Sequence, residues 1–389
     1  MKKTRFLTAF ASLVLVAFSL SAMTSKQAID LLKASVPSNA TPAAVTNSVE
    51  SAPVQVPAAG TIESTPSALP GNEMVAAGSF ARPNIAVGAN GKIFVAAEGP
   101  GMRSVWRYTT TGTGAWKGRQ FVQGTLQTAL RTYVVNIIPG GEDGEGIFCW
   151  RYGPKDGGKL HGPGVFRDGK ETFENISIGC ARLAVTPDGP ILMSRGGVFK
   201  NLTTGAIGHY NAGDSGEKLA FAVSPNGKIW ATAGNGCREL PSPVSINGQR
   251  QTWADYGTYG QWYGGDMNYP SVAIASDGSV WCVSVLGGRL RAQHIVNGKC
   301  QFPTTALRDL GDASVEERHA PPMVVSGAKV WCFYRIGKDI YRINVAKPSK
   351  GKERIASGEY PAVARGPDGR IHLVYVSGGS LHYKTLEAR

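Results

Sequence analysis

Arginine residues recur at similar places in this 389-residue chain, close to where short apolar runs begin or end. A planar guanidinium holds a carboxylate or a sulfate through two parallel hydrogen bonds. Several arginines on one face of a fold would therefore bind a polyanion. We predict substrate contacts for five of them, which are Arg82, Arg151, Arg195, Arg238 and Arg335. Arg131 and Arg182 also flank apolar runs, and alternate side chains at a strand end would instead face solvent.

The stretch QTWADYGTYGQWYGGDMNYP, residues 251–270, is much richer in aromatic residues than the whole chain, of which 9% are aromatic. Aromatic rings offer flat apolar faces with polar edges, which suit stacking on sugar rings. We predict that Trp253 and Trp262 contact substrate and that Tyr259 and Tyr263 take part in catalysis. The alternative is a loop whose rings pack on one another.

Two histidines lie in segments that join apolar runs. His161 belongs to the glycine-rich stretch RYGPKDGGKLHGPG, residues 151–164, together with Asp156, and His319 belongs to VEERHAPP. Imidazole titrates near neutral pH and is the commonest proton-transfer group in catalysis. We predict catalytic roles for His161 and Asp156 and a substrate contact for His319. The alternative is that each histidine is simply exposed on a loop.

The elements that must position these residues are short and repeated. Apolar runs flank Asn-Gly and Asp-Gly pairs, which favour hairpin turns because both residues tolerate positive φ. These turns recur every 38 to about 53 residues, and 50 glycines argue against helices. Four strands with their loops need about 40 to 45 residues, which is the length of one propeller blade. The sequence predicts an all-β, seven-bladed β-propeller over residues 71–389.

The two ends of the repeat region are similar to each other. EMVAAGSFARPNIAVGANG at 73–91 parallels ERIASGEYPAVARGPDG at 353–369, and the last repeat lacks its outer strand. We therefore predict that residues 73–78 form that strand and close the ring, which removes open sheet edges.

The N-terminus predicts export. Lys2, Lys3 and Arg5 precede the apolar run from Phe6 to Leu20, as in a secretory signal peptide. We expect a signal peptide at 1–22, a short helix and flexible linker at 23–70, and a secreted or periplasmic protein. After cleavage no stable membrane insertion is expected, because no second apolar run follows.

Charge indicates the kind of partner. The net charge is +13, of which the signal peptide contributes three, so the exported chain would carry +10. Such a protein attracts polyanions, and we expect an acidic polysaccharide or glycan as the partner. Nucleic acid is not expected, because no basic block or RNA-binding motif appears. We expect a monomer. An alternative is that the charge serves only solubility.

Two stretches resemble a known family. PDGRIHLVY at 367–375 and FARPNIAVGANGKIFVAAEGPGMR at 80–103 are similar to the sialidase-like, BNR-type propellers, which include sialidases and propeller polysaccharide lyases. The resemblance implies that Arg82 binds a carboxylate. It also implies a tyrosine nucleophile, Tyr259 or Tyr263, that Glu98 activates while Asp156 serves as the acid.

Two reactions fit this inventory of residues. One is β-elimination from a uronic acid, in which arginines neutralise the carboxylate and His or Tyr transfers protons. The other is sialidase-like hydrolysis. A carbohydrate- or protein-binding propeller without catalysis is the alternative. No cofactor is expected, because no P-loop, dinucleotide fingerprint or metal motif appears.

Overall fold

A computed structural model gives the structure of part of the chain. It describes residues 63–64, 72–99, 105–110, 115–121, 130–138, 147–154, 164–167, 170–173, 182–186, 189–194, 198–205, 207–211, 220–224, 229–233, 236–240, 250–252, 270–302, 307–316 and 319–388. All of them belong to the second of two compact units, Pro57–Arg389. The expected signal peptide lies outside the described residues, as does nearly all of the expected linker.

The first four sheets in chain order are built mostly from strands that follow one another along the chain, and two of them add one strand from another part of the chain. The β3 sheet contains β3 (Ala81–Val87), β4 (Ile93–Glu98), β5 (Val105–Thr110), β6 (Trp116–Phe121) and β1 (Glu63–Ser64). The β7 sheet contains β7 (Leu130–Ile138), β8 (Ile147–Pro154), β9 (Gly164–Arg167) and β10 (Lys170–Phe173). The β11 sheet contains β11 (Arg182–Thr186), β12 (Gly189–Ser194), β13 (Val198–Asn201), β14 (Ile207–Asn211) and β18 (Arg250–Thr252). The β15 sheet contains β15 (Ala220–Val223), β16 (Ile229–Ala233) and β17 (Gly236–Leu240).

The remaining sheets follow the same plan. The β19 sheet contains β19 (Ser271–Ile274), β20 (Val280–Leu286), β21 (Arg289–Val296), β22 (Lys299–Cys300) and β23 (Arg308–Asp312). The β24 sheet contains β24 (Met323–Ser326), β25 (Lys329–Ile336), β26 (Asp339–Asn344) and β27 (Lys352–Ser357), with the 3-10 turn η4 (Pro348–Lys350) before β27. The β28 sheet contains β28 (Glu359–Arg365), β29 (Ile371–Ser377), β30 (Ser380–Leu386) and β2 (Glu73–Ala76).

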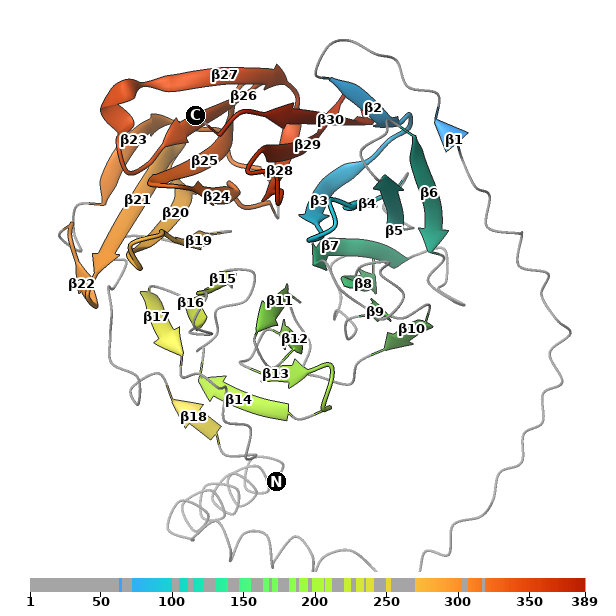
Figure 1. Ribbon diagram of the computed structural model, residues 1–389, viewed down its shortest axis with the longest axis horizontal. Helices are drawn as coiled ribbons and strands as arrows, with labels where there is room; N and C mark the ends of the chain where they lie inside the picture. The colour runs from blue at the N-terminus through green and yellow to red at the C-terminus, as the bar shows by residue number, and fades with distance from the viewer. Residues whose placement is uncertain are drawn as a thin grey trace, which may run out of the picture. The chain divides into compact units, whose positions relative to one another are not determined.

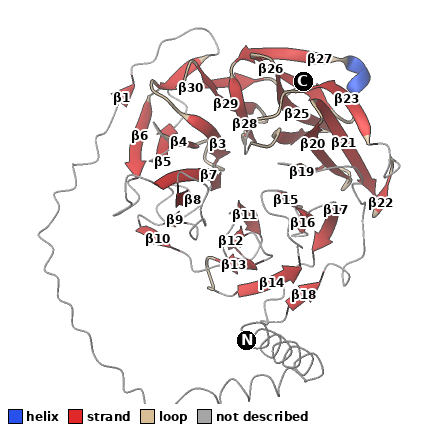
Figure 2. Ribbon diagram, turned by 180° about the vertical axis from the view of Figure 1, so that it is seen from behind, coloured by secondary structure: helices blue, strands red, loops and turns tan. Residues whose placement is uncertain are grey.

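The first strands of the sheets lie around a common centre (Figures 1 and 2). Along the chain each first strand contacts the next, from β3 through β7, β11, β15, β19 and β24 to β28, and β28 contacts β3. The prediction of an all-β, propeller-like arrangement is confirmed.

The predicted turn residues shape the hairpins where the structure describes them. Gly278 and Gly369 have φ of 80° each, a conformation that glycine adopts without steric cost. The preceding aspartates accept hydrogen bonds from the backbone two residues on, with 2.9 Å from the Ser279 nitrogen to Asp277 and 3.0 Å from the Arg370 nitrogen to Asp368. Such Asx turns explain why the Asp-Gly pair recurs.

An aromatic residue recurs near the start of the second strand, as in Ile229-Trp230 and Val330-Trp331. Trp230 of β16 is 7% exposed and lies in one apolar cluster with Val280 and Cys282 of the following sheet. Trp331 of β25 packs against a cluster that joins the β24 and β28 sheets and contains Leu373. At both positions the aromatic side chain therefore has a structural role between sheets.

Strands from opposite ends of the described region share the β28 sheet. In β2 and β30, Glu73 lies opposite Tyr383 and Ala76 opposite Leu381. The indole nitrogen of Trp116, in the β3 sheet, donates a 3.2 Å hydrogen bond to Glu73. Residues near 73 therefore join the β28 sheet to the β3 sheet.

The sequence has six cysteines, and an even number in an exported chain permits disulfides, of which Cys282–Cys300 is one conceivable pair. The structure does not join these two residues by a disulfide. Cys282 is fully buried in the apolar cluster between sheets, where cysteine behaves as a small apolar residue. Cys149 and Cys180, the other suggested pair, are not both among the described residues.

Candidate functional site

Two adjacent first strands begin with the same unusual backbone. Arg82 and Tyr360 have φ of 45° and 52°, and each precedes a proline. The register of β3 shifts between Ala81 and Asn84, and that of β28 shifts between Glu359 and Ala362. Positive φ at a side chain of this size costs about 1–3 kcal/mol, and such bulges occur beside functional sites because they redirect side chains. The entrances of β3 and β28 are therefore candidate positions for a site.

Arg82 is held by Glu98, the last residue of the neighbouring strand β4. Arg82 Nε lies 2.8 Å from Glu98 Oε1, and Arg82 Nη2 pairs with the other carboxylate oxygen. Both side chains are buried, at 4% and 0% exposure. This two-point contact fixes the plane of the guanidinium. Sequence analysis predicted both residues as site residues, and the structure places them in one ion pair.

A cavity of about 120 Å³ lies among the first strands of four sheets, which are β3, β11, β19 and β28, and the segment that leads into β24. Its lining residues are Arg82, Asn84, Ile85, Arg182, Ser271, His319, Ala320, Pro322, Pro361, Ala362 and Val363. Arg82 and Arg182 present guanidinium groups to this cavity that can donate hydrogen bonds to an anionic ligand, while Glu98 already balances the charge of Arg82.

His319 is fixed in the wall of this cavity. Its Nε2 lies 2.6 Å from the carbonyl oxygen of Pro361, and its ring stands edge-on to Tyr360 at 5.6 Å. A carbonyl oxygen only accepts hydrogen bonds, so Nε2 carries the proton in the neutral ring. Burial lowers the pKa of His319 to about 4. The hydrogen bond to Pro361 raises this pKa, whereas the positive charges of Arg82 and Arg182 lower it further. His319 is therefore neutral at pH 7, with its Nδ1 lone pair available to a proton.

Glu316 lies beside His319 in the loop between β23 and β24. It accepts a 2.6 Å hydrogen bond from the backbone nitrogen of Tyr360 and lies 3.2 Å from Nε of Arg335. Burial raises the pKa of Glu316 to about 7, although the Tyr360 bond and Arg335 oppose the shift. This carboxyl group therefore gains and loses a proton near neutral pH.

Charged groups near Tyr360 act on the pKa of its hydroxyl in both directions. Burial raises the pKa of its hydroxyl, and Glu359 and Glu316 add to this, while Arg82 and Arg335 act in the opposite direction. A tyrosine whose pKa is raised is a weak nucleophile at neutral pH. Its backbone nitrogen donates to Glu316 and its ring contacts His319, so Tyr360 joins Glu316 to the wall of the cavity.

The structure brings four of the predicted site residues into one region, namely Arg82, Glu98, His319 and Arg335. For Arg151 in β8 and Arg238 in β17 only the strand is described. The other predicted residues lie outside the described part of the chain, namely Asp156, His161, Arg195, Trp253, Tyr259, Trp262 and Tyr263.

Sequence analysis missed Glu316 and Tyr360. The signal for Tyr360 is the similarity between FARPN and EYPAV, which places Tyr360 and Arg82 at equivalent positions before proline. Glu316 gives no such signal, because an acidic residue in a loop is usually exposed.

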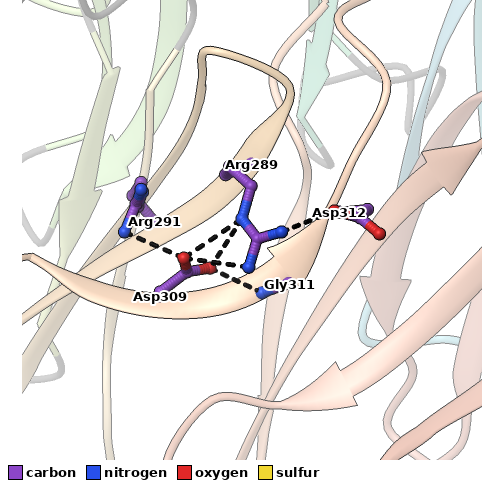
Figure 3. A network of polar contacts seen from close by, with 5 residues as sticks. All are labelled: Arg289, Arg291, Asp309, Gly311 and Asp312. Carbon is purple, nitrogen blue, oxygen red and sulfur yellow. Dashed lines mark hydrogen bonds and ion pairs between the residues drawn. The ribbon is translucent and has the colours of Figure 1, made fainter.

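Arginines on the outer strands form a different kind of cluster. Arg289 and Arg291 of β21 contact Asp309 of β23, and Arg289 also contacts Asp312 (Figure 3). Arg289 is 41% exposed, and solvent screening makes such surface ion pairs weak contributors to stability. The acidic partners neutralise these arginines, so this surface is a poor anion site.

The residues that the structure describes contain no group of three or more His, Cys, Asp or Glu side chains placed to hold a metal ion. They also contain no helix long and apolar enough to span a bilayer.

Comparisons with known proteins concern the fold alone. No family model and no curated protein matches the sequence. Streptogramin B lyase has 13% identity and a TM-score of 0.48, covering 80% of this chain and 96% of that chain. Polysaccharide lyase Uly1 has 12% sequence identity and a TM-score of 0.46, and the match covers 79% of this chain and 90% of that chain. The Hadza microbial sialidase Hz136 has 9% sequence identity and a TM-score of 0.45, and the match covers 80% of this chain and 66% of that chain. Identities this low do not distinguish a lyase, a hydrolase and a binding protein.

Proposed function

We propose that this chain is a secreted, BNR-type propeller that binds an acidic glycan at the cavity between its first strands. Each of the seven described sheets would be one blade, and β2 would complete the last blade after a signal peptide is removed. The observation that carries the proposal is the cavity lining, which contains Arg82, Arg182 and His319, with the Arg82 guanidinium held in a fixed plane by Glu98. Such a lining suits the carboxylate or sulfate of a sugar.

β-Elimination is the catalytic candidate that a specific observation favours. Neutral His319 lines the same cavity as the two arginines. As a base it would take the C5 proton of a uronic acid while the arginines stabilise the negative charge that develops on the carboxylate. The C4–O bond then breaks, a C4–C5 double bond forms, and the leaving oxygen takes a proton from solvent. Unsaturated product would identify this reaction, whereas binding without product would indicate a non-catalytic propeller.

Replacing Arg182 tests the proposal. We expect Arg182→Gln to weaken the binding of uronic acid oligosaccharides by roughly 10- to 100-fold, because a hydrogen bond to a charged group contributes about 1.5–3 kcal/mol. Isothermal titration calorimetry of the full chain would measure the loss. Arg370→Gln is the matched control, since it makes the same charge change at a turn residue that is 56% exposed. Equal affinity in both variants would contradict the proposal.

A further inference from the structure

We propose that the cavity binds its oxyanion together with a proton, which His319 takes up at Nδ1. This inference rests on the proposed function, because it concerns the same site. It goes beyond that function by making affinity depend on pH through one named side chain.

The geometry limits where the proton can go. The 2.6 Å contact with Pro361 commits Nε2 of His319 to a carbonyl oxygen. A carbonyl oxygen cannot give up a proton, so Nδ1 is the one ring atom that can change its protonation. The edge-on contact with Tyr360 at 5.6 Å fixes the ring further.

The surroundings of His319 resist a positive charge when the cavity holds no anion. Arg82 of β3 and Arg182 of β11 line the cavity with it, and both lower its pKa. His319 also lines a smaller cavity of about 10 Å³. Among the described residues, the charged or titratable groups that line these two cavities or contact the ring are Arg82, Arg182, Glu316, Tyr334, Arg335 and Tyr360. Two acids pair with these arginines, since Glu98 holds Arg82 and Glu316 lies 3.2 Å from Nε of Arg335.

An oxyanion would reverse this balance. Its negative charge would lie among Arg82, Arg182 and His319, so protonated His319 would gain an attractive partner. By linkage, the factor by which the anion raises the proton affinity of His319 is the factor by which protonation raises the affinity for the anion. A cavity of about 120 Å³ has room for such a group, since one water needs roughly 10–15 Å³ on the same measure.

Calorimetry with sulfate and with glucuronate between pH 5 and pH 8 tests the inference. Sulfate keeps its charge over this range, so any pH dependence belongs to the protein. We expect affinity to rise as pH falls below 7, by at most about tenfold per pH unit for one linked proton. Titrations in two buffers with different ionisation enthalpies should show uptake of up to one proton per bound anion.

Two variants assign the proton. His319→Gln should bind sulfate with an affinity that changes little between pH 5 and pH 7. Glu316→Gln is the matched control, because Glu316 also titrates near neutral pH, and it should keep the pH dependence. The inference would be overturned if Glu316→Gln lost the pH dependence of sulfate binding while His319→Gln retained it.

A second readout does not depend on how the variants fold. In nitrogen-15 spectra of histidine side chains in the unmodified chain, sulfate should raise the pKa of His319 and leave that of His382 in β30 unchanged. If neither anion binds at any pH, the proposed function fails and this inference with it. If both bind without pH dependence and without a shift at His319, the inference alone fails.

Discussion

Glu98→Gln is expected to reduce the free energy of unfolding by about 3–5 kcal/mol, the usual cost of removing one partner from a buried ion pair. Glu98 is fully buried and grips Arg82 at two points. The amide would leave the Arg82 guanidinium, 4% exposed, without a compensating charge. Denaturant unfolding followed by tryptophan fluorescence would measure the change.

Glu353→Gln is the control for this prediction. Glu353 pairs with Arg342 at the same 2.8 Å distance, but its side chain is 57% exposed. We expect a loss of about 1 kcal/mol or less there. The double variant Arg82→Met/Glu98→Leu should recover much of the lost stability, because it removes both buried charges at once. Similar losses for Glu98→Gln and Glu353→Gln would show that the buried pair does not have this effect.

Removal of Glu316 and removal of His319 should change the pH dependence of stability in opposite directions. The pKa of Glu316 rises in the folded state from 4.5 to about 7, so its contribution favours folding at low pH and is lost as pH rises through 7. The pKa of His319 falls from 6.5 to about 4, so its contribution is present above 6.5 and is lost as pH falls through 4. Each contribution is at most about 3 kcal/mol.

These opposite slopes should nearly cancel in the unmodified chain between about pH 4.5 and 6.5. Relative to that chain, Glu316→Gln should gain stability as pH rises from 4.5 to 7, and His319→Gln should lose stability as pH rises from 4 to 6.5. Taking differences at each pH removes the contribution of all other groups. Denaturation midpoints measured over this range would check the result, and differences that run in the same direction would contradict it.

The repeated turns made much of the fold predictable from sequence. Asp277-Gly278 and Asp368-Gly369 form the turns expected of them because the Asp side chain and the glycine backbone act locally. The packing of Trp230 and Trp331 between sheets was also predictable, since an apolar aromatic at a fixed place in a repeat has few other locations. The β14–β18 pair is parallel and joins strands of different repeats, so no local sequence pattern predicts this pairing.

The site was predictable only in part. Arg82 and His319, which line the cavity, could be predicted because a guanidinium binds anions and an imidazole transfers protons, and both properties belong to the residue type. Their partners depend on contacts between distant segments, such as the 44 residues that separate Glu316 from Tyr360. Burial decides the pKa of Glu316, and burial is a property of the assembled sheets rather than of the loop sequence.

The pairing of β2 with β30 has a consequence for biosynthesis. Residues near 73 leave the ribosome long before those near 383, yet they hydrogen-bond to each other. Until then β2 lacks its strand partner, and unpaired strand edges are the places where chains associate wrongly. A stop codon shortly before Ser380 would remove a partner from both β2 and β29. Such a truncation would therefore expose strands at both ends of the nascent chain, although it removes only the last few residues.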